Sequence, residues 1–122
     1  MADKTVVSSL DEWLNLPEPV LPVLKSEREK GTIYTVHKVG FFAVSRDECR
    51  KRNVQAVSAP DGKCILPTAL LEFAGEKTLC RLPIDLAPWG EHSVAMAHSG
   101  MNPFPCGVEF GRLQGRAYAE IL

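Results

Sequence analysis

The fold is decided by residues 54–82, VQAVSAPDGKCILPTALLEFAGEKTLCRL, which contain two hairpin signals in succession. Asp61-Gly62 and Ala74-Gly75-Glu76 are turn sequences, and each lies between segments rich in apolar residues. Asp-Gly is among the strongest short-range signals for a hairpin, because both residues tolerate the backbone angles of a tight turn. We therefore predict two strand pairs, which join 54–58 to 63–66 and 70–73 to 77–82.

The same pattern continues on both sides of this stretch. Towards the C-terminus, Gln114-Gly115 predicts a third hairpin between 108–113 and 116–121, with Ile121 facing the interior. Towards the N-terminus, residues 33–39 and 41–44 are rich in β-branched and aromatic residues, as strands are. Gly40 separates these two segments, and we predict a β-bulge there.

Short helices are predicted where serine is followed three residues later by glutamate. Ser9-Leu10-Asp11-Glu12 and Ser45-Arg46-Asp47-Glu48 both have this capping-box form. Residues 92–98 are ambiguous, because they fit a strand with four larger residues on one face or a helix that ends at Gly100. Alanine and methionine favour the helix slightly.

These elements predict a single-domain α+β protein with an antiparallel sheet built from hairpins and one to three short helices. A small barrel is the alternative form of this sheet. Residues 1–30 are expected to form a short helix and a proline-rich arm packed on the domain. Residues 31–122 are expected to form the antiparallel α+β core.

Composition and charge exclude several classes of protein. The 122 residues are 45% hydrophobic and 24% charged, which is the balance of a globular domain. With 14 basic and 15 acidic residues the net charge is −1, so binding to nucleic acid in general is unlikely on electrostatic grounds. No apolar stretch approaches the roughly 20 residues that span a bilayer, and no secretion signal is recognisable, so we expect no membrane contact and a cytoplasmic location.

The cysteines and histidines do not predict a metal centre. Four cysteines occur without a Cys-x-x-Cys pair, and we expect Cys64 and Cys80 to be small buried residues. His92 and His98 are six residues apart, which brings them together neither on a strand nor on a helix. We therefore expect no bound metal and no cofactor.

The richest set of candidate functional residues lies between Ala87 and Gly107. Pro103 and Pro105 stiffen the second half of this stretch, and rigid apolar side chains dominate the energetics of interfaces. The leading hypothesis is therefore a binding or adaptor module for a protein partner or a small apolar ligand, with a homodimer as one form of partner. The expected contact residues are Trp89, Met101 and Phe104.

Two other functions compete with binding. A small cysteine enzyme would use Cys106 as nucleophile with His92 or His98 as base, although no known local signature of such enzymes surrounds them. We therefore lean against an enzyme. A nucleic-acid-associated regulator is the third hypothesis, and it would use the basic residues Arg46, Arg50, Lys51 and Arg52.

Overall fold

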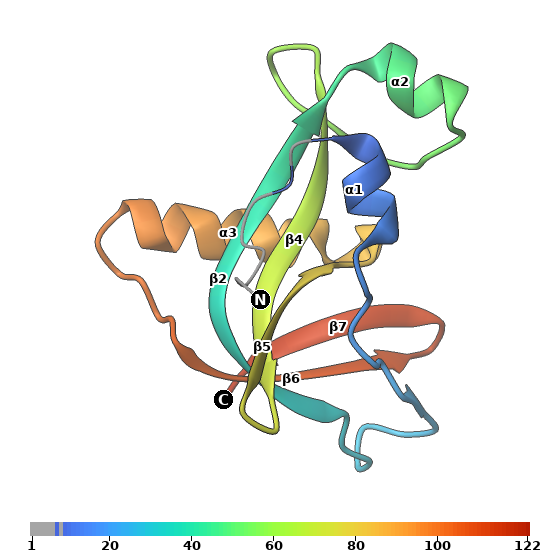
Figure 1. Ribbon diagram of the computed structural model, residues 1–122. Helices are drawn as coiled ribbons and strands as arrows, with labels where there is room; N and C mark the ends of the chain where they lie inside the picture. The colour runs from blue at the N-terminus through green and yellow to red at the C-terminus, as the bar shows by residue number, and fades with distance from the viewer. Residues whose placement is uncertain (1–6, 8) are drawn as a thin grey trace.

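The computed structural model describes Val7 and residues 9–122, and these form an α+β fold with one large sheet (Figure 1). The sheet of the described residues has seven strands and is antiparallel, except that β1 pairs with β6 in parallel. In chain order the elements are α1 (Leu10–Asn15), β1 (Val23–Leu24), β2 (Thr32–Val44), α2 (Arg46–Lys51), β3 (Val57–Ser58), β4 (Cys64–Phe73), β5 (Glu76–Arg81), the 3-10 helix η1 (Ile84–Leu86), α3 (Ala87–His98), β6 (Cys106–Leu113) and β7 (Arg116–Ile121).

The sheet does not close into a barrel. The strand order is β1-β6-β2-β4-β3, with β5 added to β4 and β7 added to β6. A barrel would need β5 and β7 to pair, but η1 contacts β7 instead. There the Asp85 carboxylate Oδ2 accepts a hydrogen bond from the Ala117 N–H of β7 at 3.3 Å. The Asp85 side chain thus accepts a hydrogen bond from a backbone N–H at the edge of β7. In a closed barrel, a neighbouring strand would accept this bond.

The second and third predicted hairpins are confirmed. The first is confirmed only near its turn, where Val57 and Ser58 pair with Ile65 and Cys64, and residues 54–56 are not in a strand. Phe73 pairs with Glu76 and Leu113 pairs with Arg116, so the second and third hairpins have two-residue loops. Both loop residues have positive φ in each case, at 53° and 85° in one and 54° and 78° in the other. These are the angles of a type I′ turn, whose twist matches that of the strands it joins. The loop residues are Ala74, Gly75, Gln114 and Gly115.

The predicted interruption between residues 66 and 70 is wrong, because β4 runs straight through Pro67. Proline cannot donate to a β-ladder, so it is tolerated only where no partner needs its N–H. The Pro67 carbonyl accepts from the Leu82 N–H at 3.0 Å, one residue beyond the end of β5. In an antiparallel strand the nitrogen and carbonyl of one residue point to the same side, so the Pro67 nitrogen also faces the end of β5. The missing N–H therefore removes no hydrogen bond between β4 and β2.

The predicted bulge at Gly40 is also wrong. Residues 33–39 and 41–44 belong to one strand, β2, in which Gly40 pairs regularly with Thr68. The register shift lies between Val36 and Lys38, at His37. An extra residue reverses the alternation of side chains, so Val36 and Val39 both face the same core cluster.

The helix predictions are confirmed. The Ser9 hydroxyl accepts a hydrogen bond from the Glu12 N–H at 3.2 Å, and Ser45 does the same for Glu48. Residues 92–98 are helical as part of α3, which begins at Ala87. The segment that follows α1 is extended, and its carbonyls at Pro17 and Pro22 each accept a backbone N–H, from Arg81 and Arg112, at 2.9 Å.

Buried side chains form two clusters, one on each face of the sheet. α3 crosses the first face behind β2 and β4, and α1 lies on the second (Figure 1). The first cluster contains Val36, Val39, Ala69, Leu71, Cys80, Leu82, Leu86, Val108, Phe110 and Ala117. The second contains Leu10, Trp13, Leu16, Val44, Cys49, Cys64, Leu66 and Leu79.

Candidate functional site

Helix α3 approaches the sheet closely because the residues that face β2 are small. Gly90 is buried, and a Cβ at this position would lie 3.1 Å from Phe41 Cζ. Ser93 is 1% exposed, and its hydroxyl has no hydrogen-bond partner within the described part of the chain. The close approach of α3 fixes the position from which the following loop starts.

The end of α3 has the geometry that its Gly100 predicts. Gly100 has φ +88°, and its N–H donates to the Ala97 carbonyl at 3.3 Å. The Met101 N–H donates to the Met96 carbonyl at 2.9 Å. This pair of bonds is a Schellman motif, which satisfies the last carbonyls of a helix and sets the direction of the chain.

Trp89 and Phe104, two of the predicted contact residues, anchor the region to the core. Both are half-buried and pack against the first cluster. Their ring centroids are 6.4 Å apart in an edge-to-face arrangement, and the Trp89 ring lies 5.8 Å from Phe110. Such contacts stabilise beyond the area they bury, so these two side chains hold the loop in place.

Met101, the third predicted contact residue, points into solvent and is 67% exposed. Three residues further on, the Phe104 N–H donates to Asn102 Oδ1 at 3.1 Å, which stiffens the intervening turn. The structure therefore divides the predicted set. Met101 is exposed at the surface, whereas Trp89 and Phe104 pack against the first cluster.

The residues of the enzyme hypothesis are not joined to one another. His92 and His98 are exposed on α3. Since successive residues of an α-helix are rotated by about 100°, the two side chains lie about 120° apart around the helix axis. Cys106 is half-buried at the start of β6, opposite Val36. Within the described residues, no hydrogen bond links its thiol to either histidine.

The electrostatics of the cysteines favour the thiol over the thiolate. Burial raises the pKa of Cys106, whereas a nucleophilic cysteine needs a lowered pKa. Burial likewise raises the pKa of Cys80 to about 11 and raises the pKa of Cys49, which also lies beside Cys64. Among the described residues, no group of three or more His, Cys, Asp or Glu side chains converges as a metal site would require.

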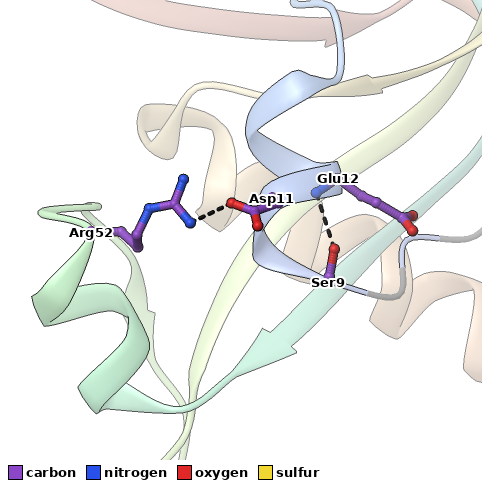
Figure 2. Close-up of polar contacts among 4 residues, drawn as sticks. All are labelled: Ser9, Asp11, Glu12 and Arg52. Atoms are coloured by element: carbon purple, nitrogen blue, oxygen red, sulfur yellow. Dashed lines mark hydrogen bonds and ion pairs between the residues drawn. The ribbon is translucent and has the colours of Figure 1, made fainter.

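The basic residues of the nucleic-acid hypothesis lie in and just after α2, and one of them is already paired. The Arg52 Nη1 atom bonds Asp11 Oδ1 at the start of α1, as Figure 2 shows. This ion pair connects two helices that are 41 residues apart at these positions. Arg46, Arg50 and Lys51 are exposed.

Several polar contacts join residues that no sequence pattern connects. His37 Nε2 lies 2.6 Å from Glu72 Oε1, from neighbouring strands. The Arg81 guanidinium lies 5.4 Å above the Trp13 ring, and its Nε is 3.5 Å from a Glu18 carboxylate oxygen. The Arg81–Trp13 pair borders a groove of about 540 Å³ between α1 and the chain around residue 54. The paired residues are 35 to 68 positions apart in the sequence, so they come together only when the sheet forms.

A concave site on the second face was also missed, although one signal pointed to it. Gly40 was interpreted as a bulge, but a glycine inside a strand also marks a place where another group approaches the backbone. In the structure Gly40 lies in the wall of a cavity together with Thr68 and Lys38.

Comparison with known proteins adds no identification, because no family model, curated protein or solved structure matches this chain. Of the helices in the described part of the chain, none has the length and apolar character needed to cross a bilayer.

Proposed function

We propose that this protein is a binding or adaptor module that contacts a protein partner through the loop of residues 99–105. The observation that carries the proposal is the exposure of Met101, at 67%, on a loop fixed at both ends. The Schellman motif fixes one end, and the packing of Phe104 on Trp89 fixes the other. An apolar side chain on a rigid loop loses little conformational entropy on binding.

The chemistry of the exposed side chain supports the same proposal. Methionine is polarizable and adapts to irregular surfaces, and it is frequent at surfaces that bind other proteins. Trp89 and Phe104 act in this function as supports, because both side chains pack against the core cluster. The raised pKa of Cys106 favours binding over cysteine catalysis as the role of this region.

The test places a photo-crosslinking amino acid at position 101 in the cells that make the protein. We expect a discrete crosslinked product, and a product of twice the chain mass would identify a second copy as the partner. Val20 is the matched control position, since it is apolar and 64% exposed but lies outside the loop. Equal products at both positions, or none at position 101, would refute the proposal.

Once the partner is purified, titration calorimetry tests the contribution of the side chain. Met101→Lys is expected to weaken binding by about 1–3 kcal/mol, the range of an interface hot spot, with little change in melting temperature. Val20→Lys should leave the affinity unchanged. Equal effects of the two substitutions would mean that the loop is not the contact surface.

A further inference from the structure

A cavity of about 300 Å³ lies on the second face of the sheet, over β2, β4 and β5. No residue of α1 lines it, so this part of the face is not covered by the helix that buries the rest of the second cluster. Phe42, Leu70 and Leu79 form apolar walls, and all three belong to or pack against that cluster.

Gly40 and Thr68, which are directly opposite each other in the β2–β4 pair, form the floor of the cavity. A Cβ at Gly40 would lie 3.7 Å from Thr68 Oγ1, so the missing side chain leaves the space above the hydroxyl open. Thr68 is only 9% exposed, and its hydroxyl makes no hydrogen bond to any described residue. Thr68 lines the cavity, so this hydroxyl is available to a bound group.

Lys38 supplies a positive charge at the rim. It lies opposite Leu70 and belongs to the same face as Gly40, two residues further along β2. Its ammonium forms no ion pair with a described residue. The carboxylate of Glu72, the next residue of β4 on this face, is bound to His37 at 2.6 Å. The cavity therefore combines apolar walls with a hydroxyl and an uncompensated cation.

We propose that this cavity binds a small amphiphilic carboxylate. The carboxylate group pairs with the Lys38 ammonium and accepts a hydrogen bond from the Thr68 hydroxyl, and the aliphatic part lies against Phe42, Leu70 and Leu79. At roughly 30 Å³ per non-hydrogen atom, the volume suits about ten such atoms. This site is independent of the Met101 loop, because α3 covers the opposite face of the sheet.

The experiment follows backbone amides of the full chain by ¹H–¹⁵N NMR during titration with octanoate, octan-1-ol and octylamine. These probes each have eight carbons and differ in the head group, which is an anionic carboxylate, a neutral hydroxyl or a cationic ammonium. We expect octanoate to shift the amides of Lys38, Gly40, Thr68 and Leu70 in a saturable manner. Octan-1-ol should bind more weakly, and octylamine at least about ten-fold more weakly, because Lys38 repels an ammonium group.

Three substitutions assign the interactions. Lys38→Gln should weaken octanoate binding about ten-fold and leave octan-1-ol binding unchanged, since only the charged head group loses its partner. Thr68→Val should weaken octanoate binding several-fold. Gly40→Val fills the space above Thr68 and should abolish binding. If that variant does not fold, Gly40→Ala provides the same test, because its Cβ makes only ordinary van der Waals contact.

Lys63→Gln is the matched control, since it removes a lysine from an exposed turn outside the cavity and should leave octanoate binding unchanged. The proposal is overturned by any of three results. These are the absence of saturable shifts at the cavity amides, equal affinity for octanoate and octylamine, and an unchanged octanoate affinity in the Lys38→Gln variant.

Discussion

The two faces of the sheet are built differently. On the first face, α3 and a row of aromatic rings seal the core. The rings of Trp89, Phe110, Tyr34 and Phe73 follow one another with centroid distances of 5.5–5.8 Å. On the second face, α1 covers one end only, and the open cavity and paired polar side chains occupy the remainder.

The first face therefore provides most of the stability, and the second face provides the capacity to bind a ligand. A face closed by close-packed rings loses stability when a fully buried ring is removed, because the surrounding side chains cannot collapse into the space. The second face leaves a cavity lined by a threonine hydroxyl and a lysine ammonium that make no bond to a described residue, and a pocket with a few convergent polar groups is typical of a site that accepts a ligand.

Phe110→Ala should be the most destabilising of these substitutions. Phe110 is 0% exposed and contacts the rings of both Tyr34 and Trp89. We expect the free energy of unfolding to fall by about 3–5 kcal/mol, measured by urea denaturation. Phe73→Ala is the control, because the same side chain is 60% exposed there and should cost less than about 1 kcal/mol. Similar losses in both variants would show that the first face is not sealed.

Ile121→Ala tests whether the last strand belongs to the first face. Ile121 pairs with Val108 and packs against the first cluster, as its predicted inward orientation requires. Because the side chain is half-buried, we expect a loss of about 1–2 kcal/mol. The adjacent Leu122 is 65% exposed, and Leu122→Ala should change stability by less than about 0.5 kcal/mol. Equal melting temperatures for wild type and Ile121→Ala would contradict the docking of β7.

Ser9→Ala tests the cover of the second face. The Ser9 hydroxyl caps the six-residue helix α1, as Figure 2 shows. This helix buries Leu10 and Trp13 in the second cluster. Loss of a helix cap costs about 1 kcal/mol. Asp11→Asn, which removes the exposed ion pair with Arg52, should cost less than about 0.5 kcal/mol and is the comparison variant. A larger loss in Asp11→Asn than in Ser9→Ala would mean that the contact between α1 and α2, rather than the cap, holds the helix.

The smallest effect concerns a polar pair on the second face. The Tyr118 hydroxyl donates to Glu109 Oε2 at 2.6 Å, and this bond lowers the pKa of Glu109. Because the folded state then binds the proton less tightly than the unfolded state, the stabilisation is present above the ordinary carboxyl pKa and is lost as pH falls through the lowered value. Tyr118→Phe should raise the pKa of Glu109, measured by NMR titration of the carboxyl carbon. Tyr34→Phe should leave it unchanged, and equal shifts in both variants would exclude this bond as the cause.

The features that depend only on neighbouring residues could be predicted from the sequence. The two-residue loops at 74–75 and 114–115 adopt positive φ because their own residues tolerate it. Ser9 and Ser45 begin their helices, and Gly100 ends α3, through hydrogen bonds between residues at most five positions apart. The hairpin order then follows, which gives the α+β class. These elements need no information from distant parts of the chain.

The tertiary structure alone decided the continuity of the long strands, the position of the bulge and the division of the predicted site residues. Pro67 is accommodated because β5 ends beside it, and the bulge lies at His37 rather than at Gly40, which pairs regularly with Thr68. Trp89 is held against the core because its ring packs edge-to-face with that of Phe110, which is 21 positions away in the sequence. Each of these outcomes depends on contacts between segments that the chain brings together only on folding, and no local pattern encodes such contacts.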